Sequence, residues 1–398
     1  MVSANDTMGL GTENSVPSGR REALILFTLL AISISALAAV SALVSRFEAW
    51  QNRLAQHMKQ QGELAFAAGQ SSLAITFFRS ALTFSRNDPV ALLKLAECLR
   101  AENRLDESEA YLHTLWDREP QDATVNLELA RLATRRGQIN DALRYYHNAI
   151  YGIWSSAPLH NRIAARFEVI EFLLRQNAVP QAQSELIAMQ PDLPPNSHLH
   201  TRVAELFQSI GDNRDAESEF QLALKLDRRN VPAAAGAGRA AFRLGHYRTA
   251  ILYLDAAVAK ARPDQETEDM LESARLVLAT DPFLRNLSAI EREERILRAY
   301  RAASLRLESC RKAQSAAPTS AGLNGAPSST PLENLVARER QLRSQMRPAL
   351  LDRNPELPAA AMSFAFEVED ETAQLCGDPA PLDRALLLIA RNREGVER

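Results

Sequence analysis

The chain has 398 residues, of which 46% are hydrophobic and 24% are charged, and its formal net charge is −3. These values are ordinary for a folded protein, and the charge gives no reason to expect a nucleic-acid partner. The three cysteines exclude a disulfide-dense scaffold, and no CxxC or clustered Cys/His spacing indicates a zinc site. Because alanine and leucine are plentiful and β-branched runs are scarce, we predict an all-α fold of two or three units.

The amino-terminal end consists of a polar stretch followed by an apolar one. Residues 1–22 are mostly polar, show no periodicity and are predicted to be a disordered tail. Residues 23–45 contain no charge, Pro, Gly, Asn or Gln, and a helix of this length crosses the roughly 30 Å hydrocarbon core of a bilayer. We predict one uncleaved transmembrane helix that continues into folded structure near Trp50. A cleaved signal peptide is the alternative, although its apolar region usually has only about 7–15 residues.

The orientation of this helix is set by the arginines and lysines beside it. Arg20 and Arg21 precede the apolar stretch, and Arg46, Arg53 and Lys59 follow it. The numbers of positively charged residues on the two sides of the helix are therefore similar, so the positive-inside rule gives no clear orientation. The short tail favours an amino terminus inside the cell, with the rest of the chain outside the cytoplasm, and the opposite orientation stays open.

A small residue recurs after this helix with spacings of 34, 34, 40, 34 and 34 residues. The six positions are Ala74, Ser108, Ala142, Ala182, Ala216 and Ala250. Four residues later comes a large residue, and three further on comes a second apolar one. The large residues are Phe78, Leu112, Tyr146, Leu186, Phe220 and Leu254. Five residues before each small residue stands Gly or Asn, which tolerate the left-handed conformation of a helix end: Gly69, Asn103, Gly137, Asn177, Gly211 and Gly245.

Residues at i, i+4 and i+7 share one helix face, so this repeat frame places a small residue where a neighbouring helix approaches closely. Over residues 53–263 the frame resembles the tetratricopeptide repeat (TPR) family, whose repeats have 34 residues. The resemblance implies a solenoid of about six helix-turn-helix repeats with a concave surface that binds proteins or peptides. It also implies a non-enzymatic scaffold, similar to the anchored TPR proteins of the bacterial inner membrane.

The remaining segments depart from the repeat frame. Six extra residues near 155–160 account for the spacing of 40. Residues 264–314 are predicted to be capping helices, and residues 315–331 to be a flexible linker rich in Ala, Pro, Ser and Gly. Residues 332–398 are predicted to be a small helical tail, whose last helix must bury one side.

No motif predicts catalysis or a cofactor. Residues 236–241 match the dinucleotide fingerprint G-x-G-x-x-A, but no strand is expected before them, and Gly238 falls on a small-residue position of the sixth repeat. His198 and His200 lack a further ligand at metal spacing and are predicted to be surface residues. We therefore predict no enzyme, no cofactor, no metal and no small-molecule substrate.

The resemblance places the ligand face on the first helix of each repeat. At mapped positions 9, 12 and 13 of that helix, an acidic row runs beside a basic one: Glu97, Arg100, Arg131, Arg135, Glu171, Arg175, Glu205, Arg239 and Arg243. These groove residues would either pair with one another or orient a bound peptide. The basic and asparagine clamp of TPR domains that bind heat-shock chaperones is absent, because Glu63 and Lys94 stand where asparagines are needed.

Three functions follow from these features. We favour a membrane-anchored scaffold that binds a partner protein or peptide; the alternatives are a self-assembling structural protein, and an enzyme or regulator whose activity lies in residues 332–398. Cys310 and Cys376 flank the linker, and in an oxidising compartment they could pair and hold the tail against the array. Two free thiols in a reducing cytoplasm are the other possibility.

Overall fold

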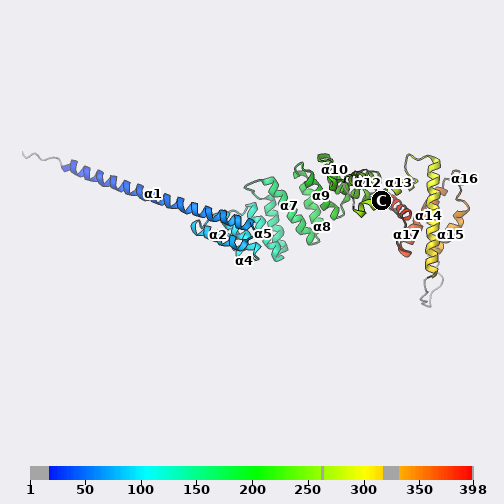
Figure 1. The fold of residues 1–398 in the computed structure, drawn as a ribbon, viewed down its shortest axis with the longest axis horizontal. Helices are drawn as coiled ribbons and strands as arrows, with labels where there is room; N and C mark the ends of the chain where they lie inside the picture. The colour runs from blue at the N-terminus through cyan, green and yellow to red at the C-terminus, as the bar shows by residue number, and fades with distance from the viewer. Residues whose placement is uncertain (1–17, 261–263, 317–330, 397–398) are drawn as a thin grey trace, which may run out of the picture. The chain divides into compact units, whose positions relative to one another are not determined.

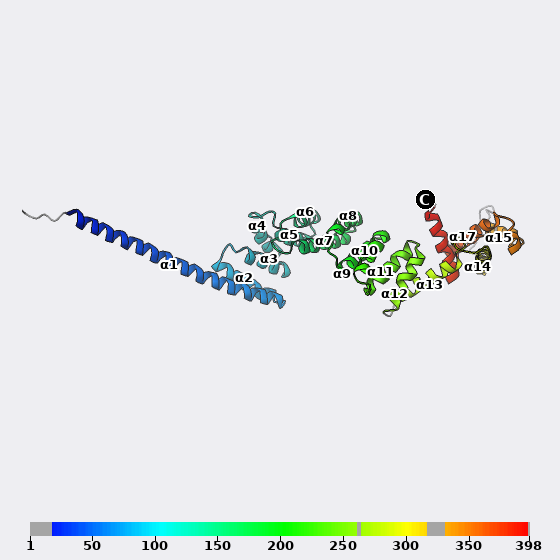
Figure 2. The ribbon, with the colours of Figure 1, turned by 90° about the horizontal axis from the view of Figure 1, so that it is seen from above.

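The computed structural model describes residues 18–260, 264–316 and 331–396 (Figures 1 and 2). These residues form eighteen α-helices and one 3₁₀ turn and contain no strand, so the all-α prediction is confirmed. Most of the tail predicted over 1–22 and of the linker predicted over 315–331 lies outside the described residues. The chain divides into two compact units, residues 1–172 and 173–398, and the boundary falls inside helix α7.

The first unit holds three helix pairs and most of a seventh helix. Its helices are α1 (Ser18–Ala67), α2 (Ser71–Phe84), α3 (Pro89–Ala101), α4 (Leu105–Trp116), α5 (Ala123–Arg136), α6 (Ile139–Tyr151) and α7 (Pro158–Arg175). Asp88 and Asp122 cap α3 and α5, because each side chain accepts hydrogen bonds from two backbone amides of the first turn. The starts of α3 and α5 are therefore stabilised by a capping aspartate.

The repeat frame is built as the spacing predicted. The small residues and the large residues four positions later are buried, with Tyr146 at 2% exposure and the others at 0%. Ser108 takes the small position of the second repeat and donates a hydrogen bond of 2.8 Å to the carbonyl of Ala96 on the neighbouring helix. All six Gly and Asn turn residues have positive φ, from 57° at Asn177 to 84° at Gly211. Each helix pair therefore reverses at a left-handed residue.

Helix α1 joins the apolar segment to the first repeat without a break. It begins at Ser18, five residues before the predicted start, because residues 20–22 are good helix formers and nothing there stops the helix. All side chains of residues 23–50 are exposed, whereas Ala55, Lys59, Gly62 and Ala65 are buried. The apolar part of α1 thus has no protein partner among the described residues, and its carboxyl-terminal part packs on α2.

The extra residues of the fourth spacing form a loop and an additional turn of α7. After α6 ends at Tyr151, the chain is pinned beside the start of α5: the Ile153 amide donates to the Gln121 carbonyl at 2.8 Å, and the Ile153 carbonyl accepts from Ala123 at 3.0 Å. Helix α7 then begins at Pro158, a residue suited to a first turn. The insertion is therefore an ordered corner of the array.

The second unit continues the helix pairs and ends in a bundle. Its helices after α7 are α8 (Val179–Met189), α9 (Ser197–Ser209), α10 (Asn213–Leu226), α11 (Val231–Arg243), α12 (Tyr247–Val258), α13 (Gln265–Thr280), α14 (Ala289–Ala316), α15 (Pro331–Arg343), α16 (Pro348–Leu351), α17 (Leu357–Leu375) and α18 (Pro381–Val396), with a 3₁₀ turn at Gln190–Asp192. The apolar residues of α13 to α18 share one core, which includes Ala299, Phe364 and Leu386.

The last helix returns to the end of the repeats. The Tyr247 hydroxyl at the start of α12 donates to the Leu388 carbonyl of α18 at 3.5 Å, and the Asn392 side chain donates to the Gly245 carbonyl at 3.5 Å. Because α18 packs on α13, the apolar residues Leu386 and Ile389 are buried. The tail is thus part of the structure that closes the array.

Candidate protein-binding face

The nine groove residues lie on the first helices of five successive repeats: α3, α5, α7, α9 and α11. Arg135, Arg175, Glu205 and Arg243 are exposed, and the other five are partly buried. Side chains that are partly buried on a helix surface keep fewer rotamers, so their charges occupy defined places. The first unit holds five of the nine, and there the contacts are densest.

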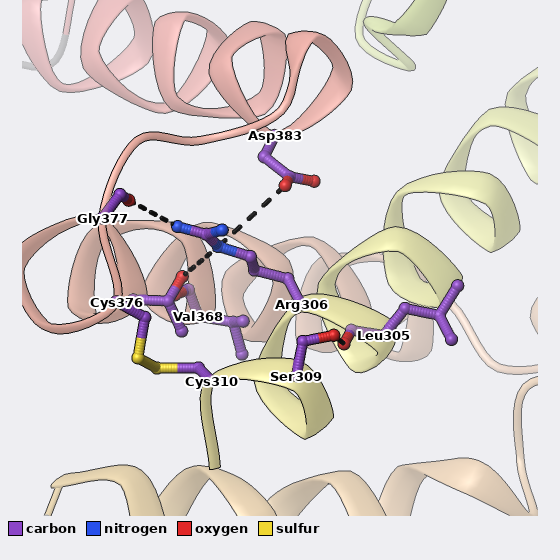
Figure 3. Close-up of a disulfide and its surroundings, with 9 residues drawn as sticks. Leu305, Arg306, Ser309, Cys310, Val368, Cys376, Gly377 and Asp383 are labelled. Carbon is purple, nitrogen blue, oxygen red and sulfur yellow. Dashed lines mark hydrogen bonds and ion pairs between the residues drawn. A yellow bond between two sulfur atoms is a disulfide. The ribbon is translucent and has the colours of Figure 1, made fainter. Parts of the chain in front are cut away.

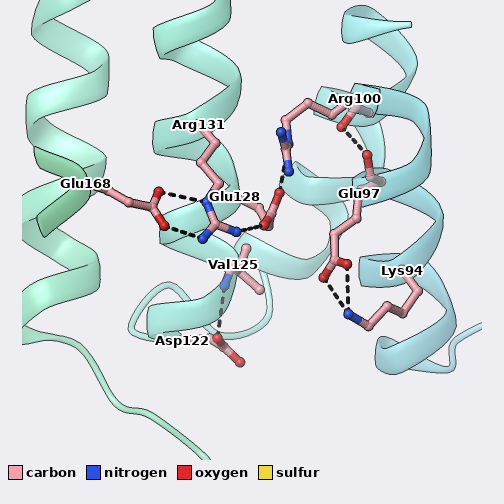
Figure 4. A network of polar contacts seen from close by, with 10 residues as sticks. Lys94, Glu97, Arg100, Asp122, Val125, Glu128, Arg131 and Glu168 are labelled. Atoms are coloured by element: carbon pink, nitrogen blue, oxygen red, sulfur yellow. Dashed lines mark hydrogen bonds and ion pairs between the residues drawn. The ribbon is translucent and has the colours of Figure 1, made fainter. Parts of the chain in front are cut away.

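A row of ion pairs connects three helices of the first unit (Figure 4). The Arg100 Nε donates to Glu128 Oε2 at 2.9 Å, and Arg131 donates to the other oxygen of the same carboxylate. Arg131 also donates from Nε to Glu168 Oε2 at 2.9 Å. The row therefore runs from α3 through α5 to α7, with Glu128 shared between two arginines. We call Arg100, Glu128, Arg131 and Glu168 the ion-pair row.

The partners in this row are not those that the sequence predicted. The acidic groove residue Glu97 pairs with Lys94 on its own helix at 2.7 Å. The arginines pair instead with Glu128 and Glu168, which lie three residues before mapped position 9 on α5 and α7. The sequence could have indicated these two glutamates, because they stand at mapped position 6, which also lines the ligand face in the TPR family.

Two pKa values are shifted at this row, that of its member Arg131 and that of the neighbouring Glu97. Burial raises the pKa of Glu97, the nearby Glu128 carboxylate raises it further, and the bond from Lys94 only partly offsets these effects. The pKa of Arg131 is raised, chiefly by its hydrogen bonds to Glu168. Glu128 is only 2% exposed, and it forms ion pairs with the guanidinium groups of Arg100 and Arg131.

Two further features lie beside the row in the first unit. Lys59 of α1 is buried and donates to Asp88 Oδ2 at 2.6 Å; burial alone would raise the pKa of Asp88, but the bonds from Lys59 and the α3 amides outweigh it and lower the pKa. A cavity of about 260 Å³ opens where α3 and α5 begin, lined mainly by apolar side chains that include Val90, Leu93 and Leu115. Such a cavity has room for one apolar side chain of a partner.

The groove residues of the second unit are more loosely held. Arg239 lies 3.8 Å from Asp264, and Arg243 lies 3.6 Å from Glu266. Within the described ranges, no ion pair involves Arg175 or Glu205 of this unit, or Arg135 of the first unit. These three charged groups are exposed to solvent.

The prediction that both histidines lie on the surface is correct for His198 and wrong for His200. His198 is exposed, as expected, but His200 is buried and its Nδ1 lies 2.7 Å from Glu219 Oε2. The period of α9 explains this, since residues 198 and 200 fall on opposite sides of the helix. Among the described residues, no group of three or more His, Cys, Asp or Glu side chains could hold a metal ion.

Cys310 of α14 and Cys376, which follows α17, are joined by a disulfide in the structure (Figure 3). Their Cα atoms are 5.5 Å apart, a usual separation for this bond. Beside it, the Arg306 guanidinium donates to the Gly377 carbonyl at 2.7 Å and to Thr372 Oγ1 at 3.3 Å. The bond and the arginine both connect α14 to the segment between α17 and α18.

One protein-family model, described as a tetratricopeptide repeat, matches residues 65–126. No curated protein matches the chain. Among solved structures, PilW, described as a widely conserved type IV pilus biogenesis factor, is 16% identical over 55% of this chain and 99% of its own, with a TM-score of 0.40. The carboxyl-terminal part of a TPR protein from Cytophaga hutchinsonii is 12% identical over 60% of this chain and 92% of its own, with a TM-score of 0.43.

The matched segment covers the second half of the first repeat, the second repeat and the start of the third. The repeat frame, with its buried small residues and left-handed turns, extends beyond it on both sides. The chain therefore contains tetratricopeptide-like repeats, which the family model matches over residues 65–126.

Proposed function

We propose that this protein is a membrane-anchored scaffold that holds a partner protein or peptide on the first helices of its repeats. The observation that carries the proposal is the ion-pair row beside the cavity at the start of α3 and α5. Because the charged side chains are already held by one another, little conformational entropy is lost when a partner docks. The exposed Arg135 lies in the last turn of α5, at the other end of this helix from the cavity, and would add a favourable charge contact with an acidic segment of the partner.

Anchoring rests on the apolar part of α1. It is the one helix in the described residues that is long and apolar enough to cross a bilayer, with a mean hydropathy of 2.6 over its most apolar window and no buried residue there. A cleaved signal sequence would also account for this stretch. Washing membranes with alkaline carbonate and measuring the mass of the retained protein separates the two, since an anchor leaves the intact chain in the membrane.

The repeats are proposed to lie outside the cytoplasm of a bacterial cell. The disulfide between Cys310 and Cys376 supports this, because such bonds persist in oxidising compartments. The tail is proposed to be structural, since α15 to α18 share a core with α13 and α14 and cover the end of the array.

The binding proposal is tested by charge reversal in the full-length protein. Arg135→Glu should reduce the amount of partner recovered after crosslinking in native membranes by about tenfold, equivalent to about 1.4 kcal/mol, because a favourable charge contact becomes a repulsive one. Val90→Glu at the mouth of the cavity should have a similar effect. Partner recovery is measured by mass spectrometry of the crosslinked complex.

The matched control is Arg144→Glu on α6, the second helix of the same repeat. Arg144 is also exposed, and its contacts are local, to Asp141 and the Tyr145 ring. The control should leave partner recovery unchanged, and all three variants should melt within a few degrees of the wild type. Equal recovery with Arg135→Glu and with Arg144→Glu would place the ligand elsewhere.

A further inference from the structure

An aromatic cluster joins α1 to the far end of α2, close to where the apolar segment stops. The rings of Phe47 and Trp50 are stacked with centroids 6.0 Å apart, and Trp50 meets the edge of Phe84, the last residue of α2, at 6.4 Å. Phe47 and Trp50 are nevertheless about half exposed. Large aromatic side chains that pack together and still face outwards are unusual on a soluble surface but common at a membrane–water interface.

The depth of this cluster follows from the geometry of α1. The uncharged segment ends at Ser45, just before Arg46, and Trp50 lies five residues further along an unbroken helix. At 1.5 Å per residue this places Trp50 roughly 7–8 Å beyond the hydrocarbon core, within the headgroup layer, which is about 5–8 Å thick on each side. Because Phe84 packs on Trp50, the turn between α2 and α3 lies at the same level.

Arginines surround the aromatic cluster. Arg46 and Arg53 of α1 and Arg86 of the turn after α2 are all exposed. The Arg53 side chain bends back towards the apolar end of α1, where its Nε donates to the Ala49 carbonyl at 3.3 Å. Among the described residues near the cluster, Glu48 is the acidic residue without a cationic partner, because Asp88 is bonded to Lys59. The local charge is therefore positive, on the side that meets lipid phosphates.

We propose that the first repeat rests on the bilayer, with Trp50, Phe84 and the α2–α3 turn seated among the headgroups of anionic phospholipids. Arg46, Arg53 and Arg86 bind the lipid phosphates, and the aromatic rings lie within the headgroup layer. This inference depends on the anchor proposed above and adds a second contact with the same membrane. With this second contact, the content of anionic lipid would influence the orientation of the repeats on the membrane surface.

The depth of the turn is measured on the full-length protein in vesicles. Arg86→Cys provides a site for a thiol-reactive fluorophore; Cys98 is buried, and Cys310 and Cys376 are bonded to each other. In vesicles of phosphatidylcholine and phosphatidylglycerol, a quencher attached to lipid headgroups should quench this label several-fold more strongly than a water-soluble quencher. Salt, or Arg46→Glu with Arg53→Glu, should reduce the headgroup quenching.

The matched control carries the label at Gln70→Cys, in the exposed turn at the opposite end of the same helix pair. This label should be reached mainly by the water-soluble quencher. If the chain floats with the vesicles but residue 86 behaves like residue 70, the membrane contact of the first repeat is wrong while the anchor stands. If the chain does not float with the vesicles, the anchor itself is wrong and this inference falls with it.

Discussion

At the scale of single residues, the most unusual group is the carboxyl of Glu369 on α17. It is 0% exposed, and neither of its oxygens has a hydrogen-bond partner among the described residues. Burial raises its pKa to about 8, and the neighbouring Asp383 adds to this, while Arg306 acts in the opposite direction. The pKa of Asp383 is also raised, chiefly by burial. Glu369 is therefore protonated in the folded chain at neutral pH.

This protonation makes the stability of the bundle depend on pH. In the unfolded chain Glu369 ionises near its ordinary pKa of 4.5, whereas the folded chain keeps its proton until about pH 8. The folded state binds more protons in that window, so the free energy of unfolding falls as the pH rises through it. Glu369→Gln should remove part of this fall, on the order of a few kcal/mol, since one pKa unit corresponds to about 1.4 kcal/mol.

The measurement is urea unfolding of the wild type and the variant at several pH values from about 5 to about 8. Glu369→Gln should lose less stability than the wild type across this range, although Asp383 contributes a smaller dependence of the same sign. Parallel curves for the two proteins would mean that Glu369 is ionised and solvated in the folded chain.

At the scale of helices, the packing of α10 on α11 depends on a glycine. A Cβ atom at Gly236 would lie 2.2 Å from Cζ of the Phe220 ring, far inside contact distance. Gly236→Ala should therefore destabilise the array by about 1–3 kcal/mol, although alanine favours helix more than glycine does. Phe220→Leu should recover part of this loss in the double variant, because the smaller side chain makes room. Thermal unfolding of the four proteins tests the coupling; additive effects would show that the ring moves aside freely.

The helices and their pairing could be predicted because their causes are local and repeat along the chain. The six turn residues and the buried small residues follow from the period, and Gly238 was rightly assigned to repeat packing. Ion-pair partners could not be derived in this way. Arg131 pairs with Glu168, which is 37 residues away, and the insertion before α7 breaks the period between them. The place of α18 on α13 could not be derived either, since no periodicity connects the two sides of the linker.

At the scale of the whole molecule, the redox state of Cys310 and Cys376 in cells distinguishes an oxidising compartment from a reducing one. Thiols are labelled with maleimide after the protein is taken from cells and unfolded, since burial raises the pKa of the Cys98 thiol to about 12 in the folded chain. With the repeats outside the cytoplasm, one thiol should be labelled without reductant and three with it. The bond closes a loop with a sequence separation of 66, so Cys310→Ala with Cys376→Ala should lower stability by about 4 kcal/mol. Three labelled thiols without reductant would favour a cytoplasmic location.

If α1 is the proposed membrane anchor, its unbroken course also fixes the direction in which the proposed ligand face points in the plane of the membrane. A rigid helix transmits rotation, so each alanine inserted after Arg46 should turn the repeats by about 100° and lift them by about 1.5 Å. If the partner is itself held in the bilayer, two inserted alanines should turn the face away from it and abolish crosslinking. Seven alanines, close to two full turns, should restore it. If the crosslinking yield instead declined steadily with the number of inserted alanines, α1 would not transmit rotation rigidly to the repeats.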